Sequence, residues 1–239
     1  MKKTIYPAIF LLFTVIVSAY CAPGASGTKE TRDLRNFSEI SFGISGHLTV
    51  RTGSDFSVVL EGDRGDLDRV ITEVNGDKLV IRHENRFFNF GNYGNIDVYI
   101  TMPGLEGLSV SGSGKAEVVN DIEHVDDLYL SVSGSGRIVT SDLYADELDC
   151  NISGSGDIII EGGGSADKAE ISISGSGTYS GKDLEINNLR VSVSGSGDCY
   201  CRVTGFLTAR ISGSGNISYS GNPQIDSRSS GSGRLRSVD

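Results

Sequence analysis

Hydrophobic and polar residues alternate with a period of two along most of the chain, and a repeated Ser-Gly-Ser-Gly block interrupts the alternation. The blocks begin at residues 111, 133, 153, 174, 194, 212 and 230, so successive blocks are 22, 20, 21, 20, 18 and 18 residues apart. Self-similarity at a period near twenty residues is typical of a solenoid, in which each repeat forms one coil.

Apolar residues fall into columns when the repeats are aligned on the block. A valine or isoleucine directly precedes six of the seven blocks: Val110, Val132, Ile152, Ile173, Val193 and Ile211. Further mostly apolar columns lie two and four residues earlier, and two and four residues after the block. Even separations put all these columns on one face of a strand. The same parity predicts that both glycines of each block face inward and both serines face outward.

These columns predict an all-β fold, a parallel, right-handed β-helix of about seven coils over residues 104–239. Stacked coils bury a continuous aliphatic core that no single coil can bury alone. Residues 35–103 lack the block but contain alternating segments such as "ISFGISGHLTV". We therefore expect irregular β coils of the same sheet system there, capping the first end of the rod, because an open strand edge invites aggregation.

The first twenty residues have the pattern of a secretory signal peptide. Lys2 and Lys3 precede an apolar run from Ile5 to Val17, which small residues follow. Cys21 offers a second interpretation, that of an acylated lipoprotein cysteine, and both stay open. Residues 21–34 would form a linker, disordered at least to Lys29. Either interpretation predicts export to the periplasm, outer membrane or cell surface of a bacterium.

The charge and the cysteines narrow the classes of partner and cofactor. A formal net charge of -10 argues against nucleic acid as a partner and leaves a lipid anchor as the only expected contact with a membrane. Cys150, Cys199 and Cys201 fall in inward columns, which predicts free buried thiols. Neither these cysteines nor the scattered histidines have the spacing of a metal site, so we expect no metal and no cofactor.

The outward serines are the most regular candidate binding surface. They form two columns: Ser111, Ser133, Ser153, Ser174, Ser194 and Ser212 in the first, and Ser113, Ser135, Ser155, Ser176, Ser196 and Ser214 in the second. One interpretation is structural, since small polar residues suit a tight coil and can hydrogen-bond along the ladder. The other is a hydroxyl-rich strip that binds a glycan or a partner protein through repeated weak contacts.

A second candidate surface is the aromatic segment "HENRFFNFGNYGN", from His83 to Asn95. Phe87, Phe88 and Tyr93 could stack on sugars or dock a neighbouring protein. They could equally plug the open end of the core.

An enzyme of the pectin-lyase-like β-helix type is the alternative to a binding module. Asp157 and Asp198 follow their blocks directly and point outward, two coils or about 10 Å apart, with Arg137 one coil before Asp157. Mixed charges on an outer column are, however, typical of any soluble solenoid. We therefore predict no catalytic residues. A structural envelope component that forms homo-oligomers is a third possibility.

The segment "VYITMPGLEGLSVSGSGKAEV", together with the repeated SVSGSG blocks, resembles the bacterial head GIN domain family, described as a "putative auto-transporter adhesin". The resemblance spans about residues 35–235. It implies an exported β-helical protein, often a lipoprotein, with an adhesin-like function and no established catalytic residues. The last repeat departs from the pattern, with serines at 227 and 229 in apolar columns and arginines at 228, 234 and 236.

Overall fold

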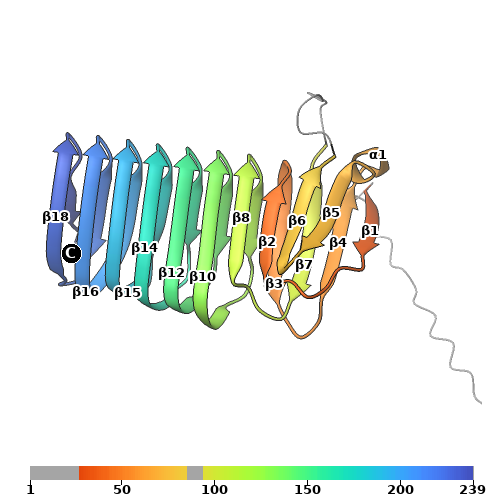
Figure 1. Cartoon of the computed structure of the whole chain (residues 1–239), viewed down its shortest axis with the longest axis horizontal. Helices are drawn as coiled ribbons and strands as arrows, with labels where there is room; N and C mark the ends of the chain where they lie inside the picture. Colours follow the sequence, from red (N-terminus) through yellow and green to blue (C-terminus); the bar gives the residue numbers. More distant parts are fainter. Residues whose placement is uncertain (1–26, 85–93, 239) are drawn as a thin grey trace, which may run out of the picture.

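The computed structural model describes residues 27–84 and 94–238 and is nearly all β (Figure 1). In this part of the chain, nineteen strands join one continuous hydrogen-bonded sheet, and one short helix, α1 (Arg64–Leu67), accompanies them. No helix among the described residues has the length and apolar character needed to cross a membrane.

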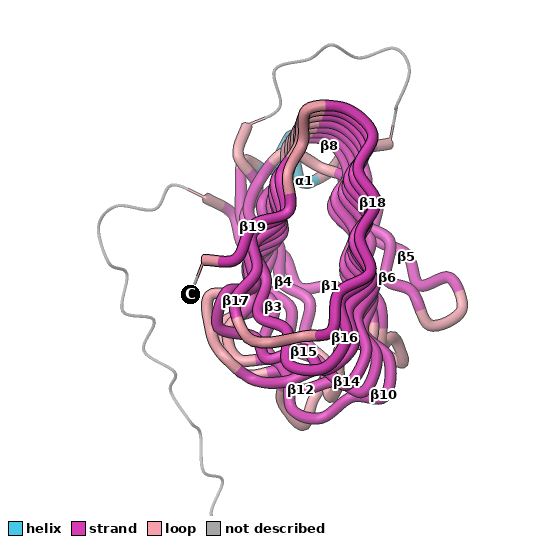
Figure 2. The backbone as a smooth tube through the Cα atoms, turned by 90° about the vertical axis from the view of Figure 1, so that its left-hand side faces the viewer, coloured by secondary structure: helices cyan, strands magenta, loops and turns pink. Residues whose placement is uncertain are grey.

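The sheet winds into a solenoid with two facing walls. The strands that lead into the blocks form the first wall: β8 (Gly107–Gly112), β10 (Ile122–Gly134), β12 (Leu143–Gly154), β14 (Gly164–Gly175), the ends of β15 (Thr178–Gly195) and β16 (Asp198–Gly213), and β18 (Gln224–Gly231). The strands that leave the blocks form the second wall: β9 (Lys115–Val118), β11 (Arg137–Thr140), β13 (Asp157–Ile160), the starts of β15 and β16, β17 (Asn216–Ser220) and β19 (Leu235–Ser237). Figure 2 shows the walls enclosing the interior and meeting at a tight bend.

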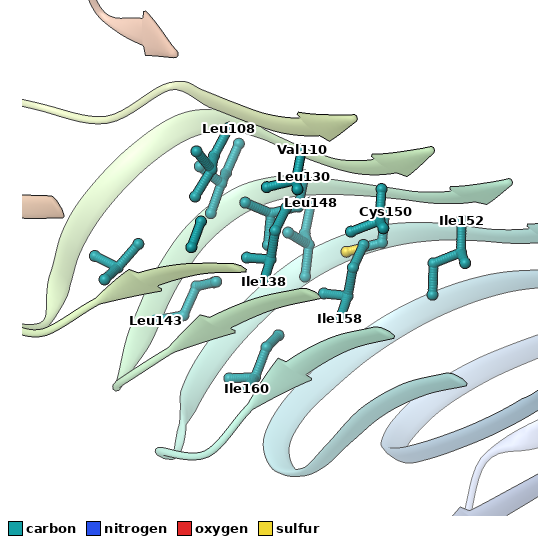
Figure 3. Close-up of a cluster of buried hydrophobic side chains, with 14 of the residues drawn as sticks. Leu108, Val110, Leu130, Ile138, Leu143, Leu148, Cys150, Ile152, Ile158 and Ile160 are labelled. Carbon is teal, nitrogen blue, oxygen red and sulfur yellow. The ribbon is translucent and has the colours of Figure 1, made fainter. Parts of the chain in front are cut away.

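Successive coils pair in parallel and in register, as the repeat predicts. Val132 pairs with Ile152, and Ile152 with Ile173, while Ser133 pairs with Ser153 in the same ladder. These aliphatic columns are buried, and side chains such as Leu130 and Ile152 of the first wall lie opposite Ile138 and Ile158 of the second (Figure 3). The predicted β-solenoid of about seven coils is therefore confirmed.

The two glycines of a block do different work, although a side chain at either position would collide with the neighbouring coil. The second glycine is buried, and a Cβ on Gly156 would lie 2.3 Å from the Gly136 carbonyl oxygen and 2.4 Å from Cγ1 of Val132. The first glycine is half-buried and makes the corner, with a φ of 121° at Gly154. A positive φ is costly for other residues, but glycine adopts it without steric cost. A Cβ on Gly154 would also lie 2.5 Å from the Gly134 carbonyl oxygen of the neighbouring coil.

The N-terminal part uses the same walls in a different chain order. β2 (Glu39–Gly43) and β3 (Gly46–Thr52) form a coil that pairs in parallel with β8 and β9 on one side. On its other side lie β6 (Lys78–His83) and β7 (Ile96–Met102), also parallel to it. Two antiparallel strands then end this part, with β4 (Ser57–Gly62) beside β7 and β5 (Val70–Asn75) beside β6.

Part of the predicted linker is a strand. β1 (Thr28–Arg32) lies antiparallel to β4, and Lys29 Nζ is 3.2 Å from Glu61 Oε2. The expectation of disorder as far as Lys29 is therefore wrong for its last residues, because β4 has an open edge whose backbone groups β1 satisfies. The predicted signal peptide at 1–20 and Cys21 lie outside the described residues.

Candidate functional site: the serine edge and the two walls

The outward serines line the bend where the two walls meet. We call this row the serine edge. It consists of the side chains of Ser111, Ser113, Ser133, Ser135, Ser153, Ser155, Ser174, Ser176, Ser194, Ser196, Ser212 and Ser214. All but the half-buried Ser111 are exposed. The backbone holds the row in register, since the amide of Ser155 donates to the Gly134 carbonyl at 2.8 Å and its counterparts in other coils do the same. The sequence-based placement of these serines on the outer surface is confirmed.

The hydroxyl groups of the serine edge are almost entirely without protein partners. In residues 27–84 and 94–238, the only member whose side chain makes a hydrogen bond is Ser113, which lies 3.1 Å from the hydroxyl of Ser45. The structural interpretation expected these hydroxyls to hydrogen-bond along the ladder. With the exception of Ser113, they do not. A serine hydroxyl is both a donor and an acceptor, so the edge presents unsatisfied groups of both kinds to solvent.

Ser45 extends the second serine column by one coil, although it lies outside the seven Ser-Gly-Ser-Gly blocks. Residues 43–46 read Gly-Ile-Ser-Gly and occupy the place of a block, because His47 pairs with Lys115 directly after the block that begins at Ser111. Ile44, buried at this corner, replaces the first glycine. An alignment of "GISGHLTV" with "SGSGKAEV", 68 residues later, was the signal that could have revealed this degenerate block.

The predicted aromatic surface remains a prediction. Phe87, Phe88 and Tyr93 lie outside the described residues. The segment that contains them joins β6 to β7, whose ends pair with the coil that carries Ser45.

A shallow groove of about 430 Å³ lies on the first wall. Charged side chains from successive coils line it, among them Glu147, Asp149, Lys168, Glu170 and Arg190, with the exposed ring of Phe206 beside them. Lys168 Nζ is 2.7 Å from Glu147 Oε1, and this hydrogen bond raises the pKa of the lysine. Partial burial raises the pKa of Asp149, and the neighbouring carboxylates of Glu170, Glu147 and Asp127 raise it further.

The second wall engages both carboxylates that the enzyme alternative would use. Arg137 donates to Asp157 Oδ2 from Nη2 at 2.7 Å and from Nε at 3.1 Å. Asp198 Oδ1 accepts from the backbone and side-chain nitrogens of Asn216 at 3.1 and 3.0 Å. Thr178 stands between the two aspartates in the ladder. Each carboxylate thus links adjacent coils, and the fold does not bring the two together around a shared space.

The three described cysteines are buried free thiols, as predicted. Burial raises the pKa of Cys150, and a hydrogen bond with Cys201 together with burial raises the pKa of Cys199. The phenol of Tyr179 is fully buried and its hydroxyl has no hydrogen-bond partner. Within the described residues, no group of three or more histidine, cysteine or acidic side chains could hold a metal ion.

These features define a class of protein: a parallel β-solenoid that presents a repeated polar edge and charged outer walls. The chain belongs to the head GIN domain family, described as "Putative auto-transporter adhesin, head GIN domain", which matches residues 36–223. This membership supports an adhesin-like role and a cell-surface or exported location in a bacterium. No curated protein matches the chain.

Solved structures share the fold. A "putative adhesin" from Bacteroides fragilis is similar with a TM-score of 0.83 and 23% identity, covering 90% of this chain and 99% of its own. A "putative adhesin" from Parabacteroides merdae has a TM-score of 0.71 and 21% identity, with coverages of 91% and 98%. A "putative lipid binding protein" from Parabacteroides distasonis has a TM-score of 0.69 and 23% identity, also with coverages of 91% and 98%. At these identities the similarity establishes the fold alone.

Proposed function

We propose that the chain is a non-enzymatic, exported module of a bacterial cell envelope that binds glycan through the serine edge. The observation that carries this proposal is the row of serine hydroxyls, nearly all exposed, of which only that of Ser113 has a partner within the described part of the chain. The backbone beneath them fixes the row in register. The family assignment supports the adhesin-like part of the proposal.

The geometry of the edge suits a polymer of repeated polar units. Adjacent coils stand about 4.8 Å apart, so each serine column repeats its hydroxyl at that interval. Each contact with a sugar hydroxyl is weak, but contacts along a rigid array add without a new ordering cost for each one. A rigid edge of this kind favours an extended glycan chain over a single sugar.

The absence of catalysis is part of the same proposal. Asp157 and Asp198 each link adjacent coils, and Thr178 stands between them, so they do not face a shared space. We expect that digests of a polysaccharide panel show no cleavage. Cleavage that Asp157→Asn or Asp198→Asn abolishes would replace the binding module with an enzyme.

A glycan array tests the binding surface. The triple variant Ser135→Ala, Ser155→Ala, Ser176→Ala removes three adjacent hydroxyls of the second column and leaves the backbone ladder intact. We expect it to lose about tenfold or more in affinity for any glycan that the unaltered protein binds. The matched control replaces Ser165, Ser180 and Ser218, which lie away from the serine edge, and should bind normally. No binding to any glycan, or equal loss in both variants, would contradict the proposal.

The location can be tested separately. A mass spectrum of the mature protein from its native envelope distinguishes an acylated Cys21 from a chain cut before or near it. Either product supports export. An intact chain that begins at Met1 in the cytoplasm would count against it.

A further inference from the structure

The outward charges of the first wall are segregated along the rod. Four carboxylates lie on three successive coils, which we call the acidic half: Asp127, Glu147, Asp149 and Glu170. Three arginines lie on the next three coils, which we call the basic half: Arg190, Arg210 and Arg228. All seven side chains are exposed. Asp226 is an exposed carboxylate on the basic half, in the column of Arg190, and Lys168 is an exposed cation on the acidic half. The prevailing sign of the wall nevertheless changes from one end to the other, although the whole chain is acidic.

Each half repels itself within one molecule. Asp149 pairs directly with Glu170 in the ladder, and Arg210 pairs directly with Arg228. Like charges placed opposite each other on neighbouring strands destabilise a sheet. In the described part of the chain, Lys168 neutralises Glu147, but Asp149, Glu170 and the three arginines have no ion pair. An external partner of opposite charge would relieve the repulsion in both halves.

A second copy of this chain has that pattern of charge. Asp149, Glu170 and Arg190 occupy one column in three successive coils. A two-fold axis that runs parallel to the strands, through the coil of Glu170, reverses the order of the coils. It brings Asp149 of each copy opposite Arg190 of the other, and the coil of Asp127 opposite the coil of Arg210. On the axis itself Glu170 meets Glu170 of the other copy, with Lys168 two residues away on the same strand. An axis parallel to the rod would instead place acidic half against acidic half.

We propose that two copies associate face to face through their first walls, with the rods antiparallel, so that each acidic half contacts the basic half of its partner. Such an interface is isologous, as in most homodimers. The exposed rings of Tyr129 and Phe206 lie on the outer face of the same wall and supply apolar contact. The strands and coils of this wall span about 23 by 29 Å, so the two copies together bury about 1,300 Å² of surface, within the range of stable interfaces.

The arrangement has a consequence for the serine edge. Because the axis runs along the strands, both serine edges lie on the same side of the dimer. The glycan-binding surface stays open and is doubled, which would raise avidity. The dimer itself does not depend on what the serine edge binds.

Sedimentation velocity of the purified protein tests the dimer. We expect a concentration-dependent dimer at low salt whose dissociation constant rises with ionic strength. Asp149→Arg and Arg190→Glu should each raise that constant about tenfold or more, because each places like charges in contact. The matched control is Lys115→Glu, an exposed reversal on the second wall, which should leave the dimer intact.

Mixing the two single variants tests the two-fold geometry. Asp149→Arg carries two positive groups and Arg190→Glu two negative ones, so each repels itself but the two complement each other. The mixture should form heterodimers, and a chain with both changes should recover the original affinity within about threefold. A strict monomer at low salt and about 1 mM, a dimer equally sensitive to Lys115→Glu, or a mixture without heterodimers would overturn the proposal. Melting curves of each variant show that the fold is retained.

Discussion

The N-terminal part and the seven block-bearing coils are built on the same two walls, but they encode them differently. In the coils from β8 onward, each strand pairs with the strand one repeat away, so the order in the chain is the order in space. In the N-terminal part, β2 and β3 lie between β8 and β9 on one side and β6 and β7 on the other. In the chain, however, β4 and β5 separate β2 and β3 from β6 and β7. Pairing with the neighbouring repeat is enough to place every strand of the block-bearing coils. The N-terminal part instead depends on contacts between residues far apart in the chain.

The distant contacts are visible where the two regions join. Asn120 Oδ1 accepts the backbone N–H of Thr52 at 2.9 Å, across 68 residues of chain. The hydroxyls of Ser45 and Ser113 are joined across the same interval. Contacts of such separation cost more loop-closure entropy than contacts between neighbouring repeats. The block-bearing coils can therefore pair one repeat at a time, whereas the N-terminal part must close longer loops before its strands pair.

The outermost strands of the two regions also differ in how they pair. Antiparallel β1, β4 and β5 end the N-terminal side, whereas the last coil simply continues in parallel register. In that coil, Ser227 and Ser229 replace the apolar Ala209 and Ile211 of the coil before it. Ser229 Oγ donates to the Gly233 carbonyl at 3.1 Å. Serines therefore occupy two core positions that are exposed in this coil.

Gly156→Ala should have the largest effect, because the block-bearing coils leave no space for a side chain at the second glycine. The new Cβ would meet the backbone oxygen of Gly136, which the ladder holds in place. We expect a loss of about 3 kcal/mol in the free energy of unfolding, measured by urea denaturation. A variant as stable as the unaltered protein would mean that the coils can move apart, and that the repeat does not fix their spacing.

High pH should weaken the block-bearing coils, since all three described cysteines lie there. Burial raises the pKa of Cys150, and hydrogen bonding and burial raise that of Cys199, so both thiols stay protonated in the folded state. Their stabilising effect is complete below the unfolded pKa near 8.5 and is lost as pH rises above it. The expected loss is about 1.4 kcal/mol per pH unit for each thiol between pH 8.5 and 10.

Denaturation curves across this pH range provide the measurement. The variant Cys150→Ala, Cys199→Ala is the control, and its free energy of unfolding should change less steeply with pH. An equal slope in both proteins would show that the thiols do not carry the effect.

What the sequence could predict follows the same division between regions. The core columns, the free thiols and the outward serines were predictable because side chains alternate along each strand, and stacking repeats the same alternation in every coil. The alternation alone did not show that Gly154 makes the corner with a positive φ while Gly156 fills the contact between coils. Ser45 was hidden because Ile44 replaces a glycine, and β1 was missed because it depends on an edge of β4 that exists only in the folded chain. The charge halves of the first wall emerge only when the coils are placed in register.

Tyr179→Phe should stabilise the protein by about 1 kcal/mol. The hydroxyl of Tyr179 is buried without a partner and lies close to Gly181, where a Cβ would be 2.5 Å from it. Removing an unsatisfied buried polar group recovers its desolvation cost. The control is Tyr99→Phe on β7, an exposed tyrosine of the N-terminal part, which should leave the melting temperature unchanged. A destabilised Tyr179→Phe variant would indicate that the hydroxyl has a partner in solution.

Gly65→Ala should have the smallest effect and the opposite sign to Gly156→Ala. Gly65 lies in α1 of the N-terminal part, and no atom would lie within 4 Å of its new Cβ. Because alanine loses less backbone entropy than glycine in a helix, the free energy of unfolding should rise by about 0.5 kcal/mol. Urea denaturation of both variants under one condition gives the comparison directly. If Gly65→Ala were as destabilising as Gly156→Ala, both effects would come from glycine replacement as such, and the tight contact between coils would not be their cause.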